Sequence, residues 1–242
     1  MKIANLKIYL LGLICIWMVM PMASYSQKQL SLIFHHKAGN EELVLGNPYT
    51  TPLGEKITVQ RFRYYISNIS LTDKQGKTIL IPLDYFLVDE ADSLSKIINL
   101  SVPDNAIGSI QFLLGVDSIR NVSGIQTGTL DPMKGMFWTW NSGYIMAKLE
   151  GTSESSTIAG HYFTYHIGGF KGVNNTLKTI TLSIPQTTTS VQELHINVDI
   201  NTWFKNSSEI RTSETAVCHM PGPLAKKIAD NYSAMFSLNA VR

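Results

Sequence analysis

Cysteine is almost absent from this 242-residue chain, which contains only Cys15 and Cys218. Cys15 lies in an apolar segment at the start of the chain, and we expect that segment to be removed as an export signal. Cys218 would then be the only cysteine of the mature chain, so no internal disulfide can form. The fold must therefore be held by burial of apolar side chains, even in an oxidising compartment.

The predicted signal peptide occupies residues 1–26. Lys2 and Lys7 supply its positive start, residues 8–20 its apolar core, and the tripeptide S-Y-S at 24–26 a cleavage site with small residues. No later apolar run is long enough to cross a bilayer. We therefore expect a protein that is periplasmic or secreted after the signal is removed.

Charge is sparse and balanced in this sequence. Lys and Arg number 20 and Asp and Glu number 18, for a formal net charge of +2. Removal of Lys2 and Lys7 with the signal would bring this charge to zero, and no basic run or stripe occurs elsewhere. Nucleic acid is therefore not an expected partner.

The sequence also lacks the motifs of common enzyme families. G-x-S-x-G, the P-loop, H-E-x-x-H and C-x-x-C are all absent. The carboxylate pairs Asp89-Glu90 and Glu41-Glu42 are adjacent residues, which would point to opposite faces of a strand. We predict that the protein is not an enzyme.

Short alternating segments separated by turn residues are abundant. Their alternation changes phase near Ser67-Asn68, which predicts a β-bulge. Helical spacing occurs clearly only at residues 223–236, with Pro223 in the first turn. The pattern predicts an all-β protein, a single antiparallel β-sandwich domain over residues 27–242 with a short C-terminal helix. Strands are predicted at residues 29–36, 57–71, 77–83, 85–88, 97–102, 110–116, 144–150, 161–167, 177–184 and 193–200.

The densest aromatic stretch is residues 130–151, LDPMKGMFWTWNSGYIMAKLEG. In an extended conformation, Met136, Trp138 and Trp140 would share one face. A core strand accounts for such residues. A short segment held between two turns, however, is more typical of one that lines a site. Both interpretations are open from the sequence.

All six histidines follow the predicted signal. His36, His166 and His195 stand at the ends of separate predicted strands, where a sandwich could bring them to one rim. Imidazoles on an exported scaffold without disulfides suit copper or zinc. Each one alone is explained more simply as a surface or hydrogen-bonded side chain. The cluster C-H-M at residues 218–220 offers soft ligands, but its spacing is too tight for all three to face one ion.

Together with its neighbours, the aromatic stretch resembles the MbnP-like family of exported bacterial copper-binding proteins. The resemblance covers nearly the whole mature chain, and its motifs are long, ordered and unusual in composition. They are RYYISNISL (63–71), YFLVDE (85–90), LGVDSIRN (114–121), LDP and GMFWTWNSGYIMAKLEG within 130–151, YHIGGF (165–170), the region of Asp199, and ADNYSAMF (229–236).

This resemblance implies a periplasmic β-sandwich that binds copper, often encoded beside a dihaem peroxidase-like partner of the MauG type. In relatives, that partner oxidises a tryptophan to kynurenine, whose aryl amine can ligate a metal, whereas an indole N–H can only donate. Trp138 and Trp140 are the matching tryptophans here, and we favour Trp140. The implied histidine ligands are His36, His166 and His195, with His35 as an alternative to His36.

Our leading hypothesis is an exported, non-catalytic protein of copper acquisition or handling that binds one copper ion through His36, His166 and His195. The alternative is a binding module without metal, in which Trp138, Trp140 and Tyr144 form an aromatic platform for a glycan or a protein. Mutation of the three histidines would separate these hypotheses. A copper redox enzyme is a third hypothesis, which requires an open coordination position.

Overall fold

The computed structural model describes residues 27–104, 106–139, 142–188 and 191–242. Within them the chain forms mainly β-strands, because short alternating segments can each bury one face. In β1 (Gln27–Ala38), Leu32, Phe34 and His36 are buried, while the residues between them are more exposed. Alternation in the sequence therefore becomes one buried and one solvent-facing side of a sheet.

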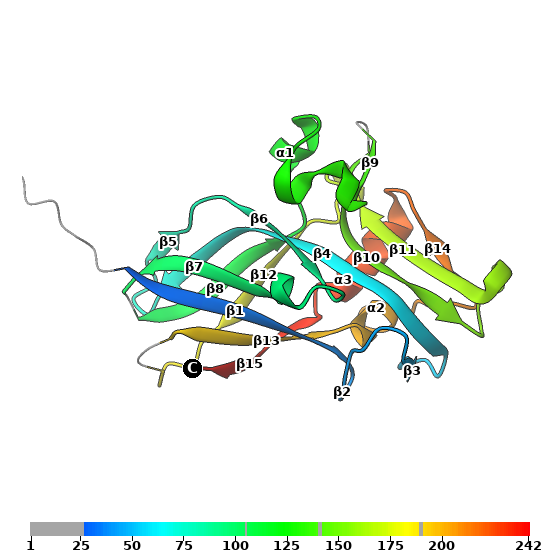
Figure 1. Ribbon diagram of the computed structural model, residues 1–242, viewed down its shortest axis with the longest axis horizontal. Helices are drawn as coiled ribbons and strands as arrows, with labels where there is room; N and C mark the ends of the chain where they lie inside the picture. Colours follow the sequence, from blue (N-terminus) through cyan, green and yellow to red (C-terminus); the bar gives the residue numbers. More distant parts are fainter. Residues whose placement is uncertain (1–26, 105, 140–141, 189–190) are drawn as a thin grey trace, which may run out of the picture.

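The strands of the described residues form a five-stranded and a ten-stranded sheet (Figure 1). The five-stranded sheet has the order β15-β13-β1-β2, and β7 also pairs with β1. Its other strands are β2 (Glu41–Glu42), β7 (Ile97–Pro103), β13 (Glu193–Asp199) and β15 (Phe236–Val241). The ten-stranded sheet has the order β12-β8-β4-β10-β11-β14, with β3, β5 and β6 also on β4 and with β9 on β10. Its strands are β3 (Pro48–Thr50), β4 (Lys56–Asp73), β5 (Thr78–Leu80), β6 (Tyr85–Asp89), β8 (Ile107–Leu114), β9 (Phe137–Thr139), β10 (Gly143–Ser153), β11 (Tyr162–Gly168), β12 (Lys178–Ser183) and β14 (Val217–Cys218).

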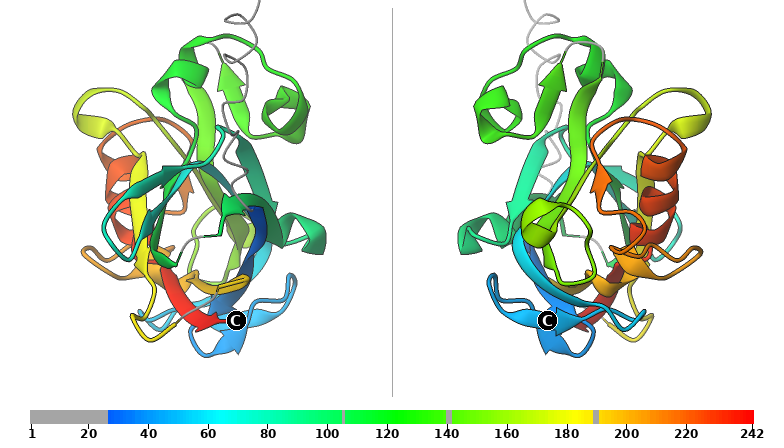
Figure 2. Two further views of the ribbon diagram at one scale, coloured as in Figure 1. Left: turned by 90° about the vertical axis from the view of Figure 1, so that its left-hand side faces the viewer. Right: turned by 90° about the vertical axis from the view of Figure 1, so that its right-hand side faces the viewer.

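Helical segments are short. α1 and the turns near it project from one end of the molecule, at the top of Figures 1 and 2, and α3 lies along one side (Figure 2). None of the helices in the described ranges is long and apolar enough to cross a membrane. The α-helices are α1 (Ser118–Val122), α2 (Asn201–Phe204) and α3 (Pro223–Tyr232), and the 3-10 turns are η1 (Ser93–Lys96), η2 (Gly128–Leu130), η3 (Pro132–Lys134), η4 (Ala159–His161) and η5 (Gly172–Asn174).

The all-β class and the C-terminal helix are confirmed, but the sheets are mixed and not purely antiparallel as predicted. β1 pairs with β13 in parallel, with Phe34 opposite Ile196. β11 pairs in parallel with β14, with Tyr165 opposite Cys218. Alternation along a strand fixes the face on which each side chain lies, but it does not fix the direction of the neighbouring strand.

The C-terminal helix is shorter than predicted. α3 begins at Pro223, as expected, but it ends at Tyr232, and Phe236 begins β15 at the edge of the five-stranded sheet. Tyr232, Met235 and Phe236 are all buried. Their apolar spacing therefore continued past the true end of the helix and concealed the start of a strand.

The bulge predicted near Ser67-Asn68 is present in β4. Asn68 has a φ of 50°, and the pairing of β4 with β8 shifts between Ser67 and Ser70. Asparagine tolerates this left-handed conformation better than most residues. Because of the shift, Ile66 and Ile69 both join the core although three positions separate them.

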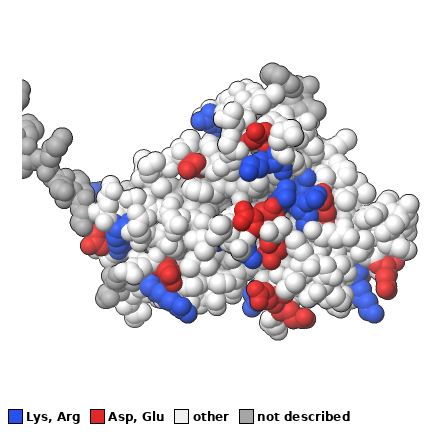
Figure 3. Space-filling view, in the orientation of Figure 1, with Lys and Arg blue, Asp and Glu red and all other residues white. Residues whose placement is uncertain are grey.

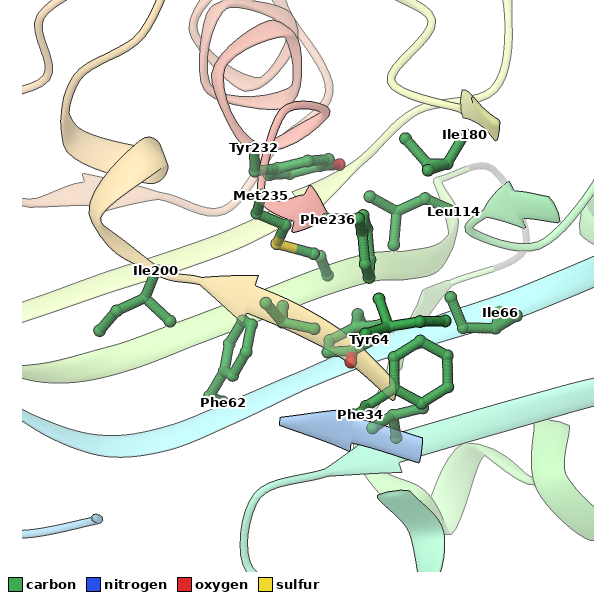
Figure 4. Close-up of a cluster of buried hydrophobic side chains, with 14 of the residues drawn as sticks. Phe34, Phe62, Tyr64, Ile66, Leu114, Ile180, Ile200, Tyr232, Met235 and Phe236 are labelled. Atoms are coloured by element: carbon green, nitrogen blue, oxygen red, sulfur yellow. The ribbon is translucent and has the colours of Figure 1, made fainter. Parts of the chain in front are cut away.

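The main apolar core lies between the two sheets (Figure 4). Phe34 of β1, Tyr64 of β4 and Phe236 of β15 pack edge to face there, with ring centroids 5.6 to 6.3 Å apart. A second, smaller cluster holds the aromatic stretch against the end of the ten-stranded sheet, and it includes Tyr65, Met136 and Tyr144. The face of the molecule in Figure 3 carries acidic and basic side chains intermixed, with no extended patch of one sign.

Candidate metal centre

His36 lies on the inward face of β1 and is 2% exposed. Its Nδ1 lies 2.5 Å from Glu90 Oε2, and its Nε2 lies 2.9 Å from the Tyr64 hydroxyl. Burial lowers the pKa of His36, and this effect outweighs the opposing one of Glu90. The neutral ring therefore donates from Nδ1 to the carboxylate and accepts the Tyr64 hydroxyl at Nε2. Both nitrogens are engaged, so His36 presents no unoccupied lone pair to a metal.

His195 lies on the outward face of β13, away from the core. His35 points the same way from β1, and its Nε2 lies 2.9 Å from His195 Nδ1. The two rings stack with centroids 5.2 Å apart. His195 Nε2 lies 3.1 Å from Glu193 Oε2. His35 and His195 thus form a pair, and His35 is on the face of β1 opposite to His36.

His166 lies on the outward face of β11. Its Nε2 lies 2.6 Å from Glu150 Oε1 on the neighbouring strand β10. Its ring stacks on that of His219, which is exposed, with centroids 4.2 Å apart and 24° between the planes. Among the residues that the structure describes, no partner hydrogen-bonds to His166 Nδ1 or to either nitrogen of His219. This pair therefore has lone pairs available to a ligand.

Glu150 is the charged anchor of this pair. The hydrogen bond from His166 lowers the pKa of Glu150 to about 2, with Lys148 and Arg61 assisting and burial opposing. Arg61 also forms an ion pair with Glu150 at 2.7 Å. Burial, followed by the proximity of His166, lowers the pKa of His219. The site thus combines an ionised carboxylate with a neutral His219 imidazole, the form that ligates metals.

Trp138 packs on the strand that carries His166. It belongs to β9, and its ring covers Gly168 so closely that a Cβ atom there would lie 2.7 Å from Trp138 Cζ3. Gly168 follows His166 by two positions on β11, so the two residues share a face. Trp138 therefore packs over the same face of β11, two positions beyond His166. Trp140 lies outside the described residues.

Tyr144 does not belong to an accessible aromatic platform. Its side chain is 0% exposed, and its hydroxyl donates to the Leu130 carbonyl at 2.8 Å. The Phe137 ring packs against it, with centroids 4.9 Å apart. The geometry therefore does not favour the platform predicted from Trp138, Trp140 and Tyr144.

The structure does not bring His36, His166 and His195 together. His36 is in the core, whereas His166 and His195 lie on the outer faces of different sheets. In the described part of the chain, no group of three or more His, Cys, Asp or Glu side chains is placed to hold a metal ion. Two histidine pairs are present instead, His166 with His219 and His35 with His195.

Sequence reasoning missed the groups that surround each imidazole. His219 reaches His166 because β14 pairs in parallel with β11, which sets Cys218 opposite Tyr165. Glu150 reaches His166 from β10, the other neighbour of β11. The cluster C-H-M was a visible signal, but strand pairing decides which histidine lies next to it. Its cysteine is buried in the main core.

The sequence model that describes the MbnP family matches this chain over residues 27–220. The chain belongs to the MbnP family. Among solved structures, MbnP from Methylosinus trichosporium is similar, with a TM-score of 0.62 and 16% sequence identity, covering 89% of this chain and 99% of that chain. At this identity the likeness to that MbnP shows a shared fold. No curated protein matches the chain significantly.

Proposed function

We propose that this member of the MbnP family is an exported, non-catalytic copper-binding protein with its centre at His166 and His219, beside Trp138. The observation that carries the proposal is the way His166 is anchored. Glu150 holds its Nε2 at 2.6 Å and leaves Nδ1 for a metal. Metal-binding histidines usually donate their other N–H to such a carboxylate, which orients the ring and raises its basicity.

The donor set fits copper. Imidazole nitrogens favour copper over hard cations such as Mg²⁺ and Ca²⁺, and the Irving–Williams order favours copper over zinc where both are available. His219 is exposed, so its side chain can adjust to an ion without disturbing the core. A role in copper acquisition or handling follows by analogy with the family.

Trp138 is the proposed third participant in the centre. An indole N–H can only donate a hydrogen bond, whereas the aryl amine of kynurenine can ligate a metal. A dihaem peroxidase-like partner of the MauG type is the proposed oxidant, again by family analogy. Trp138 is half-buried and lies next to the strand that carries His166, which supports it as the target. Trp140 is the alternative target.

Metal analysis and intact mass of the protein purified from its native host test this proposal. We expect at least one copper per chain. We also expect the peptide with Trp138 and Trp140 to be heavier by about four mass units, because kynurenine formation adds one oxygen and removes one carbon while exposing the aryl amine. An unmodified protein that also fails to take up added copper would contradict the proposal.

Histidine variants identify the ligands. We expect the double variant H166Q/H219Q to lose the copper of this centre. The matched control is H161N, because His161 lies in η4, where its Nδ1 donates to the Ser156 carbonyl at 2.9 Å. Its φ of 55° is one that asparagine tolerates. Unchanged copper binding in H166Q/H219Q would exclude these ligands, and loss in H161N would indicate damage to the fold.

A further inference from the structure

The second histidine pair lies on the outer face of the five-stranded sheet and has no part in the function proposed above. We propose that His35 and His195 form a separate surface site for a divalent transition-metal ion that prefers bond angles near 90°, Cu²⁺ or Ni²⁺. None of its residues belongs to the centre at His166 and His219. The two sites can therefore be tested independently.

The distance between the two facing nitrogens, which their hydrogen bond sets, is also the one that an ion with right-angled bonds requires. His35 Nε2 and His195 Nδ1 are 2.9 Å apart. Nitrogens about 2.0 to 2.1 Å from a metal lie about 2.9 Å apart at a right angle, but about 3.3 Å apart at a tetrahedral angle. The observed separation therefore matches neighbouring positions of a square-planar or octahedral ion, which would lie to one side of the line between the two nitrogens once the shared hydrogen has left it.

Glu193 decides which nitrogen of His195 faces the ion. It accepts a hydrogen bond from His195 Nε2 at 3.1 Å, so His195 Nδ1 carries a lone pair and His35 Nε2 supplies the shared hydrogen. When an ion binds, that hydrogen moves from Nε2 to Nδ1 of His35, and no net proton is released. Glu193 keeps its bond to His195 and anchors the ligand, as Glu150 anchors His166.

Strand pairing holds the two ligands in place. β1 and β13 are parallel neighbours, with Ile33 opposite His195 and His35 opposite Asn197. The two imidazoles are therefore diagonal neighbours on one face of the sheet. Because both strands carry buried core residues on their other face, the backbone that positions the pair is fixed before any ion arrives.

Space for further ligands of the ion lies on the His35 side of the pair. A cavity of about 450 Å³ adjoins His35, and Glu42, Asn197 and Asn239 also line it. It gives space for coordinated water, and Glu42 adds negative charge. Lys37 and Lys96 also line the cavity, and Lys96 forms a 3.1 Å ion pair with Glu90. Glu42 at the cavity and Glu193 beside His195 offset Lys37, so the local charge does not prevent the approach of a cation.

Calorimetric titration of the untagged, metal-stripped protein with Ni²⁺ and with Cu²⁺ tests the site. We expect wild type to bind two Cu²⁺ ions, and H35Q/H195Q and H166Q/H219Q to bind one each. Ni²⁺ affinity should fall at least tenfold in H35Q/H195Q. The E193Q variant should keep the ion but bind it about 10- to 100-fold more weakly, because Glu193 acts through His195.

Spectroscopy adds a readout that does not depend on stability. The electron paramagnetic resonance spectrum of H166Q/H219Q with one bound Cu²⁺ should show coupling to two imidazole nitrogens. A variant that lacks His35, His195, His166 and His219 should show no such coupling. Wild-type affinity and stoichiometry for both metals in H35Q/H195Q would overturn the second site. If H166Q/H219Q binds copper like wild type while H35Q/H195Q loses an ion, the second site stands and the ligands proposed for the first are wrong. H161N is again the control.

Discussion

Replacing His36 with phenylalanine tests whether this histidine is structural. The imidazole connects Glu90 to the Tyr64 hydroxyl inside the sandwich, at 2.5 and 2.9 Å. Phenylalanine fills a similar space in a wall that already contains Phe62, whose ring centroid lies 4.9 Å from that of His36. The H36F change therefore removes two hydrogen bonds with little loss of packing.

The expected loss of stability in H36F follows from the two hydrogen bonds that His36 makes. A hydrogen bond to a charged group contributes about 1.5 to 3 kcal/mol and a neutral one about 0.5 to 1.5 kcal/mol. Glu90 keeps its ion pair with Lys96 at 3.1 Å, but the buried Tyr64 hydroxyl loses its partner. We expect H36F to lower the free energy of unfolding by about 2 to 4 kcal/mol and Y64F to lower it by about 1 kcal/mol.

Urea unfolding followed by fluorescence and circular dichroism measures these changes. The double variant H36F/Y64F should lose less stability than the sum of the single variants, because no hydroxyl is then left without a partner. Copper stoichiometry should match wild type in every variant that folds. A loss under about 0.5 kcal/mol in H36F would refute the hydrogen-bond reasoning. A stable H36F protein without copper would instead assign His36 to the metal centre.

Three further predictions concern pH, packing and thiol reactivity. Burial lowers the pKa of His36 in the folded state, so the unfolded chain binds the proton first, and the free energy of unfolding should fall as the pH drops below 6.5, the ordinary pKa of histidine. Urea titrations at several pH values should show this dependence on pH, and H36F should reduce it. In Gly168→Ala the new Cβ would lie 2.7 Å from both Trp138 Cζ3 and the Tyr144 carbonyl oxygen. We therefore expect urea unfolding to show a loss of about 1 to 3 kcal/mol in the free energy of unfolding, together with a shifted tryptophan emission. Wild-type values of both would contradict this packing. Burial raises the pKa of the Cys218 thiol to about 11, so it should react with a disulfide reagent only after unfolding, and rapid reaction of the native protein would show that the thiol is accessible.

The features that could be predicted from the sequence are local. Alternating residues identified most strands, because the period of two directly sets which side chains a sheet can bury. The bulge at Asn68 was predicted for the same reason, since a change of phase within one strand needs an extra residue. The membership of the MbnP family was also carried by sequence, through long motifs in a fixed order.

The candidate site could be predicted only in part. His166 lies near the end of a strand, as the alternation predicts, whereas the tight spacing of C-H-M gives no sign that His219 alone would lie next to it. The structure uses only one side chain of that cluster beside His166 and takes Glu150 from β10. Three residues far apart in the chain thus meet at one place, and spacing along a single segment cannot show such a meeting.

The sequence by itself determined the all-β class, the strand faces on which His35, His36, His166 and His195 lie, and the start of the closing helix at Pro223. Only the tertiary structure decided that β1 lies parallel to β13 and β11 parallel to β14, and hence that His35 meets His195 and His166 meets His219. The physical reason is that alternation is a property of one strand, whereas the choice and direction of a neighbour depend on the packing of the whole core and on distant connections.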